Sequence, residues 1–159
     1  MDKKYILELF YYNFQVNRRI LTILDKSEAT NEQSLRLLSH LLTAERIWLM
    51  RLQGKDISEQ IIWPELPPTG CKKLLTENQM AYIDYLENIS DNDLSSDLIY
   101  KNSKGIEFHT PVIDILMHVI IHGGYHRGQI AAAIRQAGGE PVNTDYIYYV
   151  RFMKSNGNL

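Results

Sequence analysis

Four side chains that carry nitrogen or oxygen recur at the spacing of one helical face: His118, His122, His126 and Gln129. Residues four apart on an α-helix are offset by only about 40°, so their side chains stack along one line. Two imidazoles at this spacing can close on one cation without movement of the backbone, as in helical zinc motifs. His122 and His126 are therefore the first candidates for metal ligands.

A histidine on an apolar helix face also has an ordinary interpretation, as a core residue satisfied by a nearby polar group. Three imidazoles in register weaken that interpretation, because each buried ring costs desolvation and one metal ion can satisfy several rings together. A third ligand is available on a second predicted helix, where His40 lies inside an apolar arc, one turn from Leu37 and Ala44. A two-histidine site could thereby become a three-histidine site.

Length and composition point to one soluble domain. The chain has 159 residues with 17 basic and 19 acidic side chains, a net charge of -2. Such a chain can bury a sufficient core without disulfides, and its balanced charge gives no support for nucleic-acid binding. The N-terminal residues lack the pattern of a secretory signal, and no apolar stretch approaches the ~20 residues that would span a bilayer. We expect a cytoplasmic protein that contacts no membrane.

The single cysteine, Cys71, excludes an internal disulfide framework. It follows Gly70 and precedes two lysines near an expected helix start, which would favour the thiolate. The alternative is a solvent-exposed thiol without a role. Two asparagines have a similarly open interpretation: Asn13 and Asn17 share a face of the first predicted helix, where they could bond to a neighbouring helix or be solvated.

Apolar periodicity predicts four main helices. They cover residues 3–26, Thr30 to about Gln53, about 72–89 with Leu74, Leu75, Met80, Ile83 and Leu86 as the apolar face, and Thr110 to Gly138. Thr30 with Gln33 fits a capping box, and Thr110 before Pro111 fits an N-cap. On the second helix, Ser39 and Thr43 fall on the polar arc.

The connections carry their own signals. Residues 55–70 contain Trp63-Pro64 and Pro67-Pro68, which forbid a regular helix; Trp63 could cover a pocket or pack the loop onto the body. Residues 97–109 alternate as two short strands around a glycine-containing turn. A last short helix over about 144–153 has five apolar positions to bury, Tyr146, Ile147, Tyr149, Val150 and Phe152.

Four main helices with long connections and a minor hairpin describe an all-α four-helix bundle, in which metal sites are assembled from facing helices. The helix that carries the histidines also contains Gly123, Gly124 and Gly128, each costing roughly 1 kcal/mol relative to alanine. We interpret these glycines as sites of close approach by another helix, a partner subunit or a ligand.

The segment from His122 to Gln129, His-Gly-Gly-Tyr-His-Arg-Gly-Gln, together with the earlier His40, resembles the DinB (DNA-damage-inducible, YfiT-like) family. The order of the other features agrees over essentially the whole chain. They are Tyr12-Asn13 and Asn17, the Leu-Leu-Ser-His-Leu-Leu run with Glu45 and Trp48, the Asn-Ser-Lys-Gly turn, and Thr144-Asp145-Tyr146.

The resemblance implies an up-down-down-up bundle, often a homodimer, that holds one divalent ion (nickel, zinc, iron or manganese) through three histidines. Carried over by position, these are His40, His122 and His126. His118 would lie beside the site or in the core, and Gln129 would orient a ligand or a water. Arg127 points about 100° away from its neighbouring histidine, so we expect it at the surface or in a dimer contact.

Better-understood relatives are metal-dependent thiol S-transferases and isomerases, so the resemblance implies a small-molecule substrate. An open position on a divalent ion could activate a low-molecular-weight thiol, or water for hydrolysis. No carboxylate lies in the stripe from His118 to Gln129, and Glu45 projects away from His40, which slightly favours a thiol because it needs no separate base. The alternative is a non-catalytic metal-binding or stress-response homodimer, which a fourth protein ligand such as His118 would support.

Overall fold

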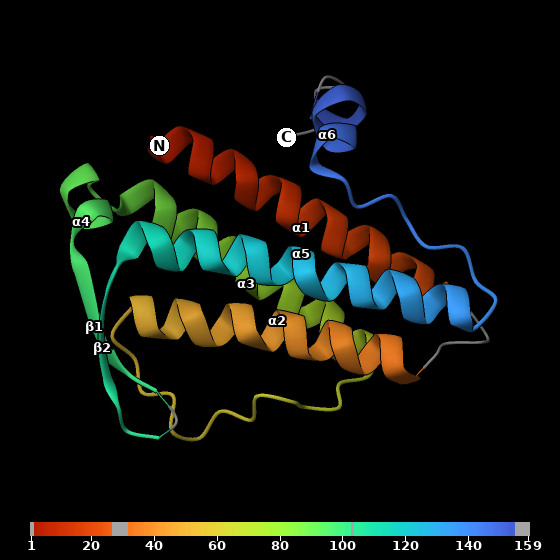
Figure 1. Ribbon diagram of the computed structural model, residues 1–159, viewed down its shortest axis with the longest axis horizontal. Helices are drawn as coiled ribbons and strands as arrows, with labels where there is room; N and C mark the ends of the chain where they lie inside the picture. Colours follow the sequence, from red (N-terminus) through yellow and green to blue (C-terminus); the bar gives the residue numbers. More distant parts are fainter. Residues whose placement is uncertain (1, 27–31, 103, 155–159) are drawn as a thin grey trace.

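The computed structural model describes residues 2–26, 32–102 and 104–154. Its four long helices are α1 (Lys3–Lys26), α2 (Glu32–Leu52), α3 (Pro68–Asn88) and α5 (Val112–Gln136). In Figure 1, α1 and α5 run in one direction, and α2 and α3 run in the other. The expected four-helix bundle and its up-down-down-up order are thereby confirmed.

The parallel course of α2 and α3 explains the long connection between them. After α2 the chain must return along the length of the bundle before α3 can start, and residues 55–67 follow the outside of α2 to do so (Figure 1). The prolines keep this segment out of a helix. Helix α3 begins at Pro68, earlier than the predicted start near residue 72, because proline is well suited to the first turn of a helix.

A short helix, α4 (Asp91–Ser95), leads into the antiparallel hairpin of β1 (Asp97–Lys101) and β2 (Glu107–Pro111). The hairpin was expected, but the prediction that Thr110 caps the next helix is wrong. Thr110 pairs with Leu98 in the hairpin, and α5 starts without a side-chain cap. Pairing with β1 extends the strand to the proline, so the backbone at Thr110 belongs to the sheet.

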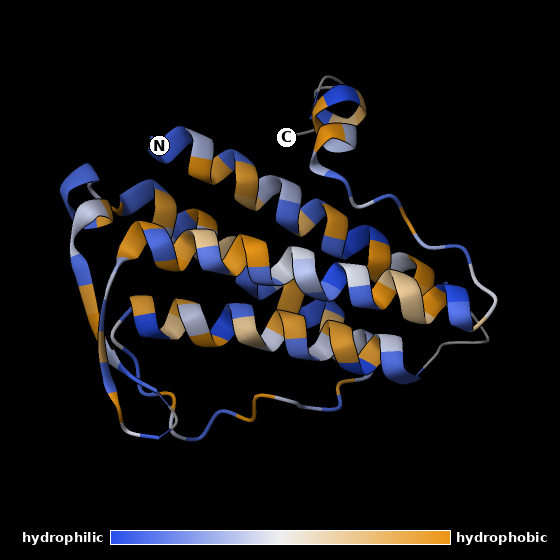
Figure 2. Cartoon of the chain, viewed as in Figure 1, coloured by the Kyte–Doolittle hydropathy of each residue, from blue (hydrophilic) through white to orange (hydrophobic). Residues whose placement is uncertain are grey.

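The core is formed by the facing sides of the four long helices, where apolar residues gather in Figure 2. On α3 the buried side chains are Cys71, Leu75, Asn78, Tyr82 and Leu86. Met80, predicted on the apolar face, is 69% exposed. Ser39 and Thr43, predicted on the polar arc of α2, are buried.

The prediction of an exposed thiol is also wrong. Cys71 is fully buried, with its Sγ 3.4 Å from Ser39 Oγ. Burial raises the pKa of the thiol, which disfavours the thiolate as well. Ser39 Oγ and the Leu66 carbonyl are the polar groups beside the sulfur, and the cysteine packs as a core residue.

Beyond α5, which ends before Gly138 at φ +81°, the chain folds back onto α1. The predicted last helix consists of α6 (Tyr146–Tyr148) and a π-helical turn, η1 (Tyr149–Met153). Tyr149 is buried and lies 5.4 Å from the ring of Tyr12, whose hydroxyl donates to the Thr144 carbonyl at 2.6 Å. Ile147 and Phe152, expected to be buried, are more than half exposed.

Two further predictions concern helix ends and membranes. The capping box that begins at Thr30 lies outside the described residues. Within the described parts of the chain, none of the helices has the length and apolar character needed to cross a bilayer.

Candidate metal centre

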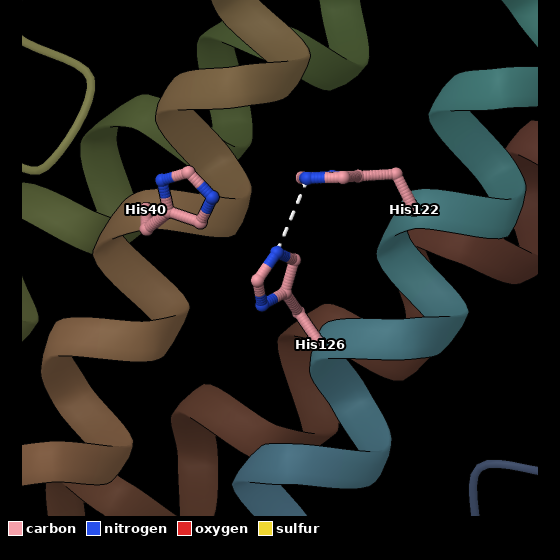
Figure 3. A group of neighbouring side chains, drawn as sticks. All are labelled: His40, His122 and His126. Carbon is pink, nitrogen blue, oxygen red and sulfur yellow. Dashed lines mark hydrogen bonds between the residues drawn. The ribbon is translucent and has the colours of Figure 1, made fainter.

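Three histidines from two antiparallel helices converge between α2 and α5. His40 comes from α2, and His122 and His126 come from successive turns of α5; their rings turn toward one another in Figure 3. One ring nitrogen of each lies within 4.8 Å of the others, a separation at which the three could hold a metal ion. His40 and His126 are buried, and His122 is partly exposed.

Two of the rings are oriented by hydrogen bonds from their outer nitrogens. His40 Nδ1 lies 2.9 Å from the Ile62 carbonyl, and His126 Nδ1 lies 2.8 Å from Gln129 Oε1. Since both partners are acceptors, each imidazole donates through Nδ1 and keeps the lone pair of Nε2 for the centre. This is the arrangement that fixes ring orientation in metal sites. Gln129, expected to orient a ligand or a water, contacts the outer nitrogen of His126. The contribution of Ile62 had no sequence signal.

The centre itself holds a close pair of nitrogens. His122 Nε2 lies 3.1 Å from His126 Nε2, so the two rings share one proton. Burial, together with the neighbouring His126, His118 and His40, lowers the pKa of His122 to about 4. Burial also lowers the pKa of His126. His122 and His126 are therefore neutral near pH 7, the state that metal ligation requires, and a cation would take the place of the shared proton.

Trp63 covers one side of this group. Its ring lies 3.6 Å from that of His40 at an interplanar angle of 6°. The same tryptophan lines a cavity of about 640 Å³ beside the histidines. Other lining residues are Gln33, Leu37, Tyr125, Gln129 and Gln136. Trp63 therefore packs the loop onto the body and also lines a pocket, the two roles expected from the sequence.

His118 does not join the three. Its ring lies 5.5 Å from the ring of His122 and 5.1 Å from that of Trp48, and its side chain is exposed rather than in the core. The group that could share an ion comprises only His40, His122 and His126 among the described residues. A fourth protein ligand from His118 is not present in this arrangement.

Arg127, expected at the surface, is buried, with 1% of its area exposed. Its Nη1 donates to Asn13 Oδ1 at 2.5 Å and to Asn17 Oδ1 at 3.2 Å. The same two asparagines donate through Nδ2 to Glu45 Oε1, at 2.6 and 3.0 Å. Two amides from α1 therefore bridge a carboxylate of α2 and a guanidinium of α5, a group that we call the amide bridge (Asn13, Asn17, Glu45 and Arg127).

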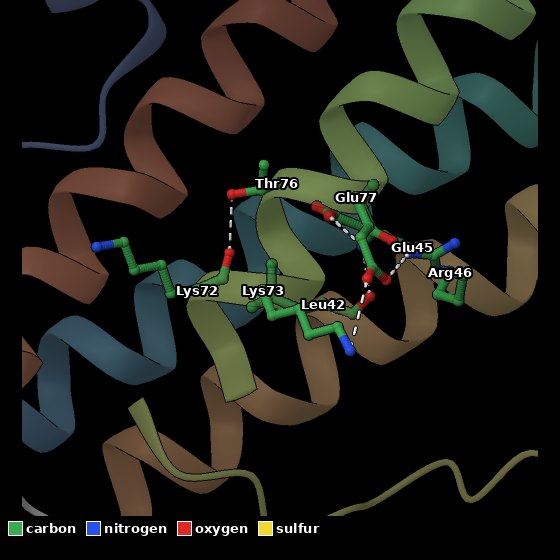
Figure 4. Close-up of polar contacts among 8 residues, drawn as sticks. Leu42, Glu45, Arg46, Lys72, Lys73, Thr76 and Glu77 are labelled. Carbon is green, nitrogen blue, oxygen red and sulfur yellow. Dashed lines mark hydrogen bonds and ion pairs between the residues drawn. The ribbon is translucent and has the colours of Figure 1, made fainter. Parts of the chain in front are cut away.

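Helix α3 closes the amide bridge. Asn78 Nδ2 donates to the Leu42 carbonyl at 2.8 Å, and the hydroxyl of Tyr82 donates to the Glu45 carbonyl at 2.7 Å. Burial raises the pKa of the Glu45 carboxyl, while the asparagine bonds and Arg127 act in the opposite direction. Glu45 is buried, whereas the next residue, Arg46, forms an ion pair with Glu77 at the surface (Figure 4).

Gly123 gives the amide bridge its space. A Cβ atom at this position would lie 2.8 Å from both Arg127 Nη1 and Asn13 Oδ1, closer than real contacts allow. The spacing of Asn13 and Asn17 was a sequence signal for this group, and the glycine one turn before Arg127 was another. The sequence does not show that the asparagines of α1 and the glycine of α5 lie side by side, because that depends on how the helices pack.

Comparisons with known proteins agree with this fold. A family model described as "DinB family" matches residues 1–156. The Bacillus subtilis (strain 168) protein DinB is 26% identical over 171 aligned positions, covering 95% of this chain and 96% of that protein. The uncharacterized protein YizA of the same strain is 27% identical, covering 89% and 94%. A DinB-like crystal structure from Bacillus cereus ATCC 10987 superposes with a TM-score of 0.59 at 21% identity, covering 87% of this chain and 94% of that one.

Proposed function

Because the chain belongs to the DinB family, we propose that it holds one divalent ion on His40, His122 and His126 and activates a low-molecular-weight thiol there. The observation that carries the proposal is the convergence of three imidazoles, each offering one ring nitrogen, beside a cavity. An idle core histidine would instead have its own private partner at both nitrogens.

The donor set fits a borderline divalent cation. Imidazole nitrogen is a good ligand for zinc, nickel and iron, and these metals and manganese are the ones that the family resemblance implies. Three protein ligands leave coordination positions open, and an ion bound there would lower the pKa of a thiol or a water toward neutrality.

The side chains around the histidines have distinct tasks in this proposal. The Ile62 carbonyl and Gln129 keep two rings aimed at the centre. Trp63 shields His40 from water, while the adjoining cavity admits the substrate. Shielding by Trp63 on one side and an open cavity on the other would let an activated thiol react with an electrophile rather than with water.

Thiol chemistry is favoured over hydrolysis by what surrounds the group. Among the described residues, no carboxylate shares the site with the three histidines. The carboxylate of Glu45, the acidic candidate on α2, accepts bonds from Asn13 and Asn17 instead. A thiol would release its one proton to solvent on activation, whereas hydrolysis would also need a group that moves the second proton of water to the leaving group. Hydrolysis remains the alternative enzymatic reaction.

Self-association is the second part of the proposal, and the alternative function is a non-catalytic metal-binding homodimer. On α5, Ile121 and Tyr125 are each 65% exposed. A Cβ on the neighbouring Gly128 would meet nothing within 4 Å. An apolar face with small residues lets a second helix approach closely, which supports a homodimer.

Metal content tests the site directly. Purified protein should contain one equivalent of zinc or nickel by elemental analysis, and His122→Ala or His126→Ala should lose it, since two histidines rarely hold a divalent ion against solvent. The matched control is His109→Ala, because His109 is exposed on the hairpin and pairs with Glu107. A full equivalent of metal in His122→Ala or in His126→Ala would refute the proposed ligands.

Thiol turnover tests the reaction. The metal-loaded protein is assayed with bacillithiol, glutathione and cysteine against monochlorobimane, with the metal-free protein as reference. A rate above that reference with one of the thiols is expected. Equal rates with all three thiols would refute thiol activation and direct attention to hydrolysis or to the non-catalytic homodimer.

A further inference from the structure

The cavity beside the three histidines extends between α2 and α5 toward one end of the bundle. His40 and His126 line it, and so do Gln33 and Gln136. Gln33 precedes His40 by seven residues on α2, and Gln136 follows His126 by ten on α5, which places the two amides roughly 10 and 15 Å from the histidines along their helices. Because α2 and α5 run in opposite directions (Figure 1), both amides lie at the same end. The cavity is therefore elongated, with histidines at one end and amides at the other.

Apolar and aromatic side chains line the cavity between these two ends. The aliphatic members are Leu37, Ala132 and Ala133. At the histidine end, the rings of Trp63 and Tyr125 lie 6.3 and 5.2 Å from the ring of His126. The volume of about 640 Å³ is that of a site for a small organic molecule. A bound molecule would thus meet apolar surface along its length and hydrogen-bonding groups at its far end.

The lining of this cavity carries no fixed charge. Among the described residues, those that line it include no lysine, arginine, aspartate or glutamate, although 23% of the chain is charged. Two other cavities, of about 590 and 450 Å³, have charged lining residues: Glu32, Arg36 and Glu65 in one, and Asp84, Asp93 and Asp97 in the other. The guanidinium of Arg36 lies 5.8 Å from the ring of Trp63, but Arg36 lines the first of these other cavities, together with two carboxylates. A charged group far from the histidines would therefore lose hydration without gaining an ion pair.

We propose that this cavity binds the electrophile, an uncharged molecule with a neutral hydrogen-bonding group, such as an amide or a hydroxyl, roughly 10 Å from the carbon that meets the thiol. This inference rests on the proposed function and adds the chemical class of the second substrate. Thiols such as cysteine and glutathione carry carboxylate and ammonium groups, so the uncharged lining fits the other reactant. A glutamine amide has two donors and two acceptor lone pairs, so Gln33 and Gln136 can bond to a ligand as well as to the protein.

Binding to the metal-free protein tests the cavity without the reaction. Octanamide and octanoate, which have the same length, are titrated separately while the side-chain amide signals of Gln33 and Gln136 are followed by nuclear magnetic resonance. The metal-free protein is used because a carboxylate can coordinate an ion directly. Octanamide should shift both signals and bind about tenfold more tightly than octanoate, whose charge finds no partner in the cavity. Equal affinities, or no binding of octanamide, would overturn the proposal.

Variants of the lining residues place the ligand. Ala132 is exposed and lines the cavity, so Ala132→Trp should fill the middle and weaken octanamide binding by about tenfold or more. The matched control is Arg135→Trp, at an exposed position of α5 outside the lining. Gln33→Leu and Gln136→Leu should each weaken octanamide about fivefold, the value of a neutral hydrogen bond, whereas Gln60→Leu, exposed on the connection after α2, should not. Unchanged binding to Ala132→Trp would overturn the assignment.

Turnover separates this inference from the proposed function. Metal-loaded protein is assayed with cysteine and either ω-bromooctanamide or ω-bromooctanoate. The thiolate sulfur forms a bond to the carbon that bears bromine, bromide leaves with the bonding electron pair, and the thiol proton passes to solvent. We expect kcat/KM to be about tenfold higher for the amide. Selective binding of octanamide without any turnover would defeat only the proposed function. Turnover with equal kcat/KM for the two electrophiles, and no preference for octanamide in the metal-free protein, would defeat only this inference.

Discussion

The three histidines lie on the same two helices as the two charged residues of the amide bridge, but the polar atoms of the two groups have different partners. His40 and Glu45 are both on α2, and His126 and Arg127 are consecutive on α5. In the amide bridge, a carboxylate and a guanidinium are joined by two asparagines that use donor and acceptor alike. His40 and His126 instead use their outer nitrogens on Ile62 and Gln129, and the inner nitrogens of the three histidines face one another.

The difference separates a polar group that stabilises the bundle from the proposed metal site. A buried polar group that bonds to other protein groups needs nothing from outside and holds the helices in register. One proton between His122 and His126 does not satisfy all three inward-facing nitrogens, and in the proposed function a cation completes them. The consecutive residues His126 and Arg127 point to these two environments because one helical step turns the side chain by about 100°.

The largest effect is expected from breaking the amide bridge. Arg127→Met leaves the buried Glu45 without its cation, and it should lower the free energy of unfolding by about 3–5 kcal/mol in urea denaturation of the metal-free protein. Arg46→Met, which breaks a surface ion pair with Glu77, should cost about 1 kcal/mol or less. Adding Glu45→Gln to Arg127→Met should recover part of the loss if buried charge is its cause. A loss below about 1 kcal/mol for Arg127→Met would contradict the contrast between the regions.

A smaller and different effect is expected from the histidines. In the metal-free protein, His122→Ala should change stability by less than about 1 kcal/mol, because the ring is partly exposed. Saturating zinc should stabilise the wild type by about 2.7 kcal/mol at a hundred times its Kd, and this gain should vanish in the variant. Thermal or urea unfolding with and without zinc measures both quantities, with Arg46→Met as the control that keeps the gain. A zinc gain that survives in His122→Ala would remove the distinction between the two regions.

Adding one methyl group at either of two glycines on α5 tests whether the amide bridge is tightly packed. Gly123→Ala places a Cβ against the amide bridge and should destabilise the protein by about 1–3 kcal/mol. Gly128→Ala, where a Cβ meets nothing within 4 Å, should stabilise it by roughly 0.5–1 kcal/mol, because alanine favours the helix. Chemical denaturation of the two variants is the measurement. Equal effects of the same sign would show that Arg127 and Asn13 yield easily to the new atom.

The pH dependence of the metal-free protein should differ in sign between the regions. The unfolded chain protonates His122 near its ordinary pKa of 6.5, whereas the folded protein keeps it neutral down to about 4. Between these values the unfolded state binds more protons, so stability falls as the pH falls. The raised pKa of the Glu45 carboxyl acts oppositely, since stability is lost as the pH rises past its ordinary value of 4.5. Unfolding measured from about pH 7 to about pH 5 should decline less in His122→Asn than in the wild type; an identical decline would refute the role of His122.

Helix spacing was enough to place the histidines on α5, and apolar periodicity was enough to expect four helices. Both follow from local geometry, because side chains four apart share a face in any α-helix. The same local reasoning misplaced Arg127 and Cys71. It assigns a guanidinium to solvent and a thiol beside lysines to the surface, and it contains no information about what the facing helix presents.

The sequence by itself therefore determined the bundle, its long connection after α2, and the candidate ligands His40, His122 and His126. Only the tertiary structure decided that α1 supplies two asparagines that bridge Arg127 and Glu45, and that Ile62 and Trp63 orient and cover His40. These partners are far apart along the chain, and whether a polar side chain is buried depends on the partners that packing brings to it. Spacing along one helix carries the first kind of information, and only the contact between helices carries the second.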